Sequence, residues 1–287
     1  MSRRRWKSAR GLGQAAAAVC AAAFGYAVFV YLTLPDVRSL KTSNPKTTAF
    51  IELRAREARA RGDEPRRIQR WVGYARISPH LTRAVLVAED SRFWKHEGID
   101  FDELKQSIEI NIERMEFARG GSTITQQLAK NLYLSPSKNP VRKAREFMIA
   151  RQLETELTKQ RILELYLNVI EWGDGIYGAE AAARTYFRKS AAELGPADAA
   201  LLAAAIVNPR ILDPARPTAR LRRRQQMVMR RMGAVTPPPV AASAAPELPP
   251  DAPDAAVPVL PVEAAPATLP GSAVPVSDRP PMLPDGR

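Results

Sequence analysis

The chain has 287 residues, one cysteine and a formal net charge of +13, and 45% of its residues are apolar. This length accommodates one medium domain with appendages or two small domains, and a single cysteine, Cys20, excludes an intrachain disulfide. The basic charge is compatible with nucleic acid, an anionic membrane surface or a phosphate-bearing substrate, and by itself it does not choose among them.

The N-terminal region carries a basic segment, residues 1–14, followed by an apolar one, residues 15–34. The apolar segment has no charged side chain and is long enough for a helix to cross a bilayer. Basic residues before such a helix favour an N-terminus in the cytoplasm and the rest of the chain outside. We expect an uncleaved transmembrane anchor; a cleaved signal peptide is the alternative and gives the same orientation. Either topology argues against nucleic acid as the partner.

The middle of the chain, from about residue 45 to residue 233, carries helix signals. Ser78 and Pro79 are typical of an N-cap and a first helical position. Helices are predicted at residues 139–158, 159–172, 196–209 and 220–232. The second of these is apolar almost all round and should be buried. We find no convincing alternating strand pattern and no internal repeat, so the sequence predicts a domain that is all-α or nearly so.

The C-terminal segment, residues 236–287, is rich in proline and alanine and has no aromatic residue. Such a composition predicts a disordered, partly polyproline II tail. We assign no chemistry to it.

Glu89 is the first candidate for acid–base chemistry. It lies four residues after Val85, close to the apolar stripe of its helix. A carboxylate held against apolar surface has a raised pKa, which suits a general base; the alternative is a solvated Glu89–Asp90 pair at a helix end. Two histidines and one cysteine supply too few ligands for a metal site of nitrogen and sulfur. We therefore interpret His96 as a structural histidine, hydrogen-bonded next to Glu89.

The stretch GGSTITQQLAKNLY, residues 120–133, combines small, hydroxyl and amide side chains with one lysine. Its two glycines allow a tight turn, and Ser122 and Thr123 can cap the helix that follows. A helix N-terminus favours phosphate or another anion. The other polar groups of the stretch are Gln126, Gln127, Lys130 and Asn131. The hypothesis is a site for a phosphorylated ligand; the alternative is a capped amphipathic helix with an exposed lysine. No P-loop pattern is present.

A third group begins at Arg142, with Lys143 beside it and Glu146 four residues on. This spacing fits an ordinary ion pair on one helical face, or a second carboxylate held by cations near a phosphate site. Farther along, Asn168, Glu171 and three glycines after them are interpreted mainly as the architecture of a closely packed turn.

Four segments together resemble a known family. EDSRFWKHEGID, GGSTITQQLAKN, RKAREFMIARQLE and ILELYLNVIEWGDGIYGAEAAARTYF look like the successive motifs of the peptidoglycan glycosyltransferases, glycosyltransferase family 51, and stand in the family's order. The resemblance covers roughly residues 45–233. With one anchor and no second catalytic domain, the chain resembles the monofunctional, biosynthetic kind.

The resemblance implies a lysozyme-like fold of two lobes with a long cleft. It implies an enzyme that polymerises lipid II, a disaccharide-pentapeptide on undecaprenyl pyrophosphate, with the growing strand as donor and inversion at the anomeric carbon. The enzyme would be a single-pass protein of the inner membrane with its catalytic domain on the periplasmic side. Its partners would be lipid II, the growing strand, membrane lipids and cell-wall synthase or divisome proteins, and not nucleic acid.

The resemblance also assigns roles to residues. Glu89 would be the general base, and Asp90, Phe93 and His96 would shape its site. The donor's pyrophosphate and sugar would be held by Ser122, Thr123, Gln127, Lys130 and Asn131, and farther on by Arg142 and Lys143. Glu146 would assist the departing pyrophosphate directly or through a divalent ion, Mg²⁺ or Mn²⁺; no organic cofactor is implied. Residues 103–119 would form a mobile flap.

Three other functions remain as alternatives. A lysozyme-like hydrolase could use two glutamates but needs neither an anchor nor a pyrophosphate cradle. A bifunctional penicillin-binding protein would need a K-T-G motif after the S-x-x-K match at Ser135–Lys138, and none follows. A non-catalytic membrane-anchored scaffold would not need the full set of matched residues.

Overall fold

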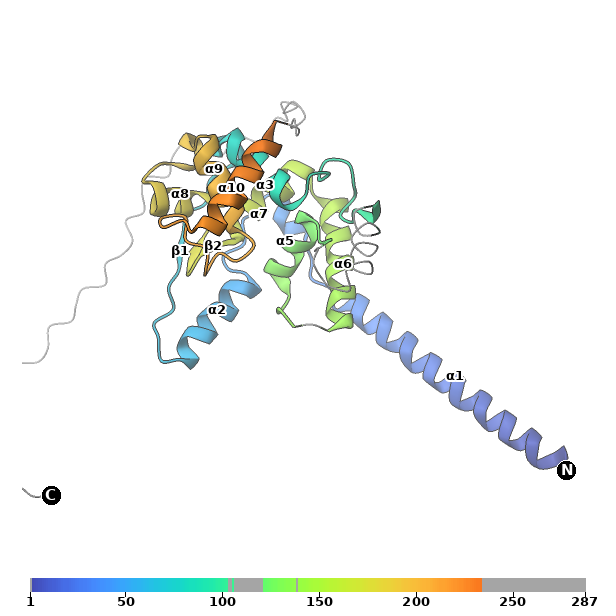
Figure 1. Ribbon diagram of the computed structural model, residues 1–287. Helices are drawn as coiled ribbons and strands as arrows, with labels where there is room; N and C mark the ends of the chain where they lie inside the picture. The colour runs from blue at the N-terminus through green and yellow to red at the C-terminus, as the bar shows by residue number, and fades with distance from the viewer. Residues whose placement is uncertain (1, 103–104, 106–120, 138, 234–287) are drawn as a thin grey trace, which may run out of the picture. The chain divides into compact units, whose positions relative to one another are not determined.

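The computed structural model describes residues 2–102, 105, 121–137 and 139–233 (Figure 1). Its α-helices are α1 (Ser2–Leu32), α2 (Ala49–Ala60), α3 (Pro79–Glu89), α5 (Ile124–Tyr133), α6 (Pro140–Glu156), α7 (Lys159–Val169), α8 (Ala179–Phe187), α9 (Pro196–Ala205) and α10 (Ala219–Met232). Short 3₁₀ helices are η1 (Arg38–Lys41), η2 (Tyr74–Arg76) and η3 (Ala191–Glu193). The predicted flap, apart from Lys105, and the predicted tail lie outside the described residues.

The helices begin where the sequence predicts, because their first side chains satisfy free backbone N–H groups. The Ser78 hydroxyl accepts a hydrogen bond from the His80 N–H at the start of α3, and Asn139 does the same for Val141 at the start of α6. Proline occupies the first position of both helices, where a missing N–H costs nothing. The domain is therefore mostly helical, as predicted.

The domain is helical apart from one small sheet, which agrees with the prediction of an all-α or nearly all-α domain. Strands β1 (Ile68–Gln69), β2 (Glu171–Gly173) and β3 (Ile176–Tyr177) form a small sheet in the order β1-β3-β2. β1 pairs parallel with β3, and β2 pairs antiparallel with β3 through an irregular register. Strands of two or three residues are too short to show an alternating pattern, so the sequence could not reveal them.

The predicted helix at residues 159–172 therefore ends early, at Val169, and its last residues enter β2. The turn that follows needs glycine: Gly175 has φ +69°, and a Cβ there would lie 2.6 Å from the Arg66 carbonyl oxygen. Gly178 has φ +85° and a similarly close neighbour, the Asn168 carbonyl oxygen at 2.8 Å. The interpretation of these glycines as architecture is confirmed.

The core is built around α7, which is buried as predicted. Ile162, Leu163, Leu165 and Leu167 have no exposed surface. α5 packs against α2, α6 and α7, while α9 packs against α3 and α10 (Figure 1). The end of α3 meets α5 where Gln127 donates a hydrogen bond to Glu89, and several of the predicted site residues lie at this junction.

The predicted anchor segment, residues 15–34, falls within α1 as far as Leu32. Phe24, Phe29 and Leu32 of this helix are exposed. A search of the described residues finds no helix that combines the length and the apolar character needed to cross a membrane. At the end of α1 the Arg145 guanidinium of α6 donates to the Thr33 carbonyl oxygen at 2.8 Å.

Candidate active site

Glu89 is the last residue of α3 and its side chain is half-buried. The Gln127 side-chain amide donates a hydrogen bond to Glu89 Oε2 at 2.9 Å. Burial raises the pKa of Glu89, while the Gln127 N–H and the charges of Arg224 and Lys130 lower it, and the net shift is upward. The predicted raised pKa of this carboxyl is confirmed.

Gln127 is itself held by a buried phenol. Tyr166 Oη donates to Gln127 Oε1 at 2.9 Å, so the amide nitrogen is left to face Glu89. Burial raises the pKa of Tyr166 well above its usual value, and the charges of Glu89 and Asp90 add to this shift. The phenol thus stays protonated and fixes the orientation of the amide. The chain Tyr166–Gln127–Glu89 gives the carboxylate one neutral donor and no direct ion pair among the described residues.

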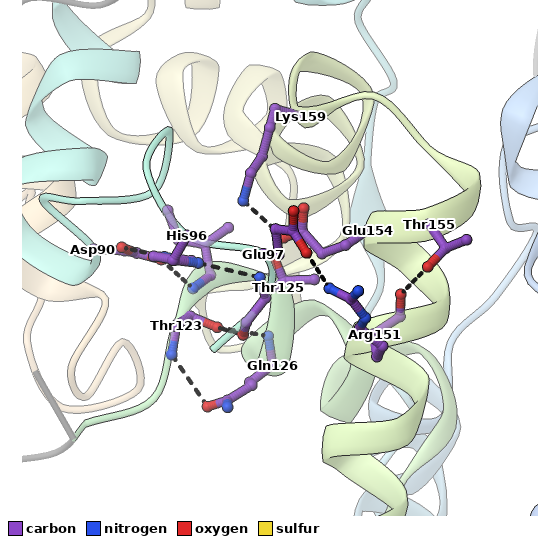
Figure 2. A network of polar contacts seen from close by, with 12 residues as sticks. Asp90, His96, Glu97, Thr123, Thr125, Gln126, Arg151, Glu154, Thr155 and Lys159 are labelled. Carbon is purple, nitrogen blue, oxygen red and sulfur yellow. Dashed lines mark hydrogen bonds and ion pairs between the residues drawn. The ribbon is translucent and has the colours of Figure 1, made fainter. Parts of the chain in front are cut away.

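Asp90, the next residue along the chain, is almost fully buried. Both its oxygens lie 3.0 Å from His96 Nε2 (Figure 2). The Gly98 N–H donates to His96 Nδ1 at 3.2 Å, so Nε2 carries the proton that binds Asp90. The alternative of a solvated Glu89–Asp90 pair is therefore wrong, and His96 has the structural role that was expected.

The N-terminus of α5 is closed by the protein itself. Thr123 and Gln126 form a capping box, with both hydrogen bonds at 3.2 Å, and Asp90 Oδ2 accepts the Ile124 N–H at 2.9 Å. The Thr123 hydroxyl donates to the Gly98 carbonyl oxygen at 2.6 Å. The expectation that this helix end is open to a phosphate is thus wrong, because Asp90 already provides the anion that the helix dipole favours.

Phe93 lies beneath these groups with no exposed surface. Its ring makes an edge contact with the His96 ring, with centroids 6.3 Å apart. Asp90, Phe93, His96 and Thr123 therefore form one packed unit that ties the loop after α3 to the start of α5. The structure brings these predicted residues together as the support behind Glu89.

Glu146 of α6 is buried and sits between two cations. Arg142 Nη1 lies 2.6 Å from Glu146 Oε2, and Lys143 Nζ lies 2.5 Å from Glu146 Oε1. Lys143 also donates to the Ser122 hydroxyl at 3.2 Å. The predicted ion pair is confirmed, and it belongs to a cluster of two cations that share one carboxylate.

Lys130 connects the two glutamates electrostatically. It is partly buried, and burial lowers its pKa, whereas the charges of Glu146 and Glu89 raise it and those of Arg142 and Lys143 lower it. All four charges are thus close enough to act on one ammonium. Asn131, the next residue, donates to the Gln127 carbonyl oxygen at 2.8 Å.

A cavity of about 270 Å³ adjoins these groups. Gln127, Lys130 and Asn131 of α5 form one wall. The other walls come from Phe50 and Arg54 of α2, Tyr166 and Ile170 at the end of α7, Glu171 of β2, and residues 206–210 after α9. The predicted residues of α5 therefore line a real concavity.

Several of these wall residues were not predicted as site residues. The sequence predicts Tyr166 as a core residue and Glu171 as part of the turn, and it assigns no role to Arg54 or to residues 206–210. Each reaches the site through contacts between distant parts of the chain, such as Arg54 to Glu171, 117 positions apart. No local pattern marks such a residue.

Across the described ranges no group of three or more His, Cys, Asp or Glu side chains could hold a metal ion. Both Glu146 oxygens are taken by cations, so this donor set does not fit a divalent ion near Glu146.

Comparison with known proteins gives the family. The transglycosylase family model matches residues 57–233. A biosynthetic peptidoglycan transglycosylase of Azoarcus sp. (strain BH72) is 46% identical over 201 residues, covering 70% of this chain and 86% of that protein. Proteins of the same name from Dechloromonas aromatica and Aromatoleum aromaticum are 49% and 52% identical, covering 63% and 58% of this chain and 78% and 73% of theirs. The chain belongs to the transglycosylase family.

Proposed function

We propose that this chain is a biosynthetic peptidoglycan transglycosylase that polymerises lipid II into β-1,4-linked glycan strands. Family membership and the names of the relatives support the activity. The observation that supports the mechanism is the arrangement along α5: Gln127 holds Glu89, and Lys130, one turn later, acts on the cation cluster at Glu146. A base and a set of cations thus adjoin one helix face.

In the proposed reaction Glu89 is the general base. Its carboxylate takes the proton of the acceptor's 4-hydroxyl as the oxygen attacks the anomeric carbon of the growing strand. The new C–O bond forms on the face opposite the leaving group, so the configuration inverts, and undecaprenyl pyrophosphate leaves with the bonding electrons. The raised pKa of Glu89 suits this role, because a base is most effective when its pKa lies near the working pH.

The departing pyrophosphate gains negative charge, which cations must stabilise. We assign this to Lys130, Arg142 and Lys143, with Ser122, Gln127 and Asn131 completing the donor site. Thr123 is not included, because its hydroxyl is already bound to the Gly98 carbonyl oxygen. Glu146 holds two of the cations in place before substrate arrives. Because its oxygens are already bound, we propose that these side chains, rather than a protein-held Mg²⁺ or Mn²⁺, supply the positive charge.

The same proposal covers the setting of the enzyme. The domain would have the two-lobed, lysozyme-like arrangement, with Asp90, Phe93 and His96 shaping the acceptor side. Residues 15–34 would anchor it in the inner membrane and leave the catalytic domain in the periplasm, where lipid II and synthase or divisome partners are met.

A glycan hydrolase is the second candidate, because two buried carboxylates can also cleave a glycosidic bond. Such an enzyme has no use for three cations around one glutamate. The two activities leave different products, long strands or short fragments, so one assay distinguishes them.

The test is polymerisation of lipid II by the purified full chain in detergent, with Glu89→Gln beside the wild type. We expect long strands from the wild type and a rate lower by about 10²–10⁴-fold for the variant, the usual contribution of a general base. A wild type that makes no strands contradicts the proposed function. Equal rates leave the function standing and contradict the role of Glu89.

A further inference from the structure

The segment that follows α1, here called the neck (residues 33–44), is fastened to the domain. Arg145 of α6 binds the Thr33 carbonyl oxygen at 2.8 Å, and Arg161 of α7 donates to the Leu40 carbonyl oxygen at 2.9 Å. These hydrogen bonds join residues that are 112 and 121 positions apart. The neck is therefore held against α6 and α7, and a site between it and these helices has fixed walls.

A cavity of about 250 Å³ lies between the neck and α6. It shares no lining residue with the cavity beside α5, so it is a separate site that the proposed reaction does not use. Its lining combines apolar and charged side chains: Leu34, Pro35, Asp36, Val37, Arg38, Gln152 and Glu156.

Glu156 holds two cations of the neck at this cavity. Lys41 Nζ lies 2.6 Å from Glu156 Oε2, and Arg38 Nε lies 3.4 Å from Glu156 Oε1. The hydrogen bond from Lys41 is the main cause of the lowered pKa of Glu156, so the carboxylate stays ionised and keeps both cations in place. The Arg38 side chain is 73% exposed, and its guanidinium retains N–H groups that can donate to a ligand.

Asp36 brings a second negative charge to the same cavity. Its Oδ1 accepts the Arg38 backbone N–H at 2.9 Å, which fixes the carboxylate close to the guanidinium along the chain. Within the part of the chain that the structure describes, Asp36 forms no ion pair. Two positive and two negative charges therefore lie at this cavity, and their sum of zero favours a dipolar ligand over an anionic one.

A headgroup that carries both a phosphate and an ammonium group matches this lining. The phosphate can accept charge-assisted hydrogen bonds from Arg38 and Lys41, and the ammonium can donate to Asp36. The cavity volume equals about eight liquid waters at ~30 Å³ each, and a phosphoethanolamine group has about as many non-hydrogen atoms. Leu34 and Pro35, both half-buried, give the glycerol end of such a lipid an apolar surface.

The position of the cavity along the chain fits a lipid as the source of this headgroup. Asp36 and Arg38 directly follow the predicted anchor, residues 15–34, whose Phe29 and Leu32 side chains are exposed. If that segment lies in a bilayer, the residues just after it lie at the level of the headgroups. The acyl chains would then run beside the exposed apolar side chains of α1. The inference therefore rests on the membrane setting of the proposed function.

We propose that the cavity between the neck and α6 binds the headgroup of phosphatidylethanolamine, with Arg38 and Lys41 on its phosphate and Asp36 on its ammonium group. α6 also carries the cation cluster of the proposed donor site. A headgroup bound at the neck thus keeps that cluster at the membrane surface, which is the level of the pyrophosphate of a lipid-linked donor.

A purely structural role for these charges explains only part of the arrangement. The pairs of Glu156 with Arg38 and Lys41 fasten the neck to α6 whether or not a lipid is bound. They do not explain why Asp36, beside them, has no cation of its own among the described residues. A structural role predicts no selectivity between lipids, whereas a dipolar site predicts a preference that depends on Asp36.

The experiment measures lipid binding to the purified full chain in detergent by native mass spectrometry. The probes are phosphatidylethanolamine and phosphatidylglycerol with the same acyl chains, because both carry the phosphate and only the first carries the ammonium group. The variants are Asp36→Asn, which keeps an acceptor for the Arg38 N–H, and Arg38→Gln. The matched controls are Asp63→Asn and Arg61→Gln, which alter a surface pair of the same sequence spacing, 3.0 Å apart, outside the cavity.

We expect the wild type to bind phosphatidylethanolamine about three- to tenfold more tightly than phosphatidylglycerol, the effect of one charge-assisted hydrogen bond at a partly exposed site. Asp36→Asn should abolish this preference and leave the affinity for phosphatidylglycerol unchanged or higher. Arg38→Gln should weaken the binding of both lipids by a similar factor. Both controls should behave as the wild type does.

The inference is overturned if the wild type binds the two lipids equally or prefers phosphatidylglycerol, or if Asp36→Asn keeps the preference. If Arg38→Gln lowers Tm because it loosens the neck, Asp36→Asn decides by itself. A wild type that polymerises lipid II without lipid selectivity contradicts this inference alone. A wild type that makes no strands contradicts the proposed function, and the lipid preference then decides the headgroup site independently.

Discussion

Glu89 and Glu146 are both withdrawn from water, yet their carboxylates have opposite kinds of partner. Glu89 receives one hydrogen bond from a neutral amide, whereas Glu146 is held between a guanidinium and an ammonium. Burial raises the pKa of Glu89, and the hydrogen bond from Gln127 offsets that rise only in part. The cations around Glu146 stabilise its charge and are in turn fixed by it.

The difference teaches that burial alone does not assign a role to a carboxylate. The carboxylate with a neutral donor has a pKa above its usual value, which suits the role of a base. A carboxylate between two cations holds them in place, and in the proposed reaction the substrate meets those cations. α5 serves both environments, through Gln127 on one side and Lys130 on the other.

Among the variants that test this comparison, Lys130→Met should lose the most activity, because the charge of Lys130 acts on both glutamates. We expect kcat/KM to fall by about 10²–10³-fold, as when one preorganised donor to a developing anion is removed. The measurement is initial rates of lipid II polymerisation. Lys189→Met, which removes a surface lysine paired with Asp198, is the control and should keep the wild-type rate; a Lys130 variant that does the same contradicts the shared role.

The second prediction contrasts the stabilities of two variants at pH 7. Glu146→Gln leaves Arg142 and Lys143 without their shared anion, and because both cations are partly exposed, we expect a loss of about 1–3 kcal/mol in the free energy of unfolding rather than the full value of a buried pair. Glu89→Gln removes a carboxylate whose ionised form is disfavoured in the folded state, so it should be as stable as wild type or more stable.

The pH dependence of the free energy of unfolding tests whether the pKa of Glu89 is raised in the folded protein. Since the folded-state pKa of Glu89 is raised above about 4.5, the folded protein binds more protons than the unfolded chain above that pH, and stability is lost as pH rises towards the raised pKa. The advantage of Glu89→Gln over wild type should therefore disappear as the pH falls below about 4.5. Urea unfolding at several pH values measures the difference in the free energy of unfolding between each variant and the wild type. If Glu89→Gln and Glu146→Gln lose the same stability at pH 7, the distinction between the two glutamates is contradicted.

Short sequence patterns were enough to predict many of the features that this comparison of Glu89 and Glu146 uses. The capped start of α3, the buried stripe that leads to Glu89, and the spacing of Arg142, Lys143 and Glu146 are all readable within one helix each. The cations and the base were therefore predicted from the sequence, together with the helical class of the domain.

The partners that distinguish the two glutamates were not predictable in this way. Gln127 reaches Glu89 across 38 positions and Tyr166 reaches Gln127 across 39, and the Asp90 carboxylate that closes α5 comes from 34 positions away. Such contacts are set by how helices pack, which a 3.6-residue period does not encode. For the same reason the sequence did not reveal the short strands.

The smallest effect at neutral pH, and the sharpest test of the neutral partner, is expected from Gln127→Leu. The Gln127 N–H lowers the pKa of Glu89 by stabilising its charged form, so its removal should raise that pKa further. The acid limb of kcat/KM against pH should then move to higher pH, with a smaller move in the same direction for Tyr166→Phe, which only frees the amide to rotate. Polymerisation rates over the acid range measure the limb. An unmoved limb in Gln127→Leu means that the titrating base is not the carboxylate this amide touches, whereas a limb that moves to lower pH means that the amide faces Glu89 with its oxygen and that the order of donors in the Tyr166–Gln127–Glu89 chain is reversed.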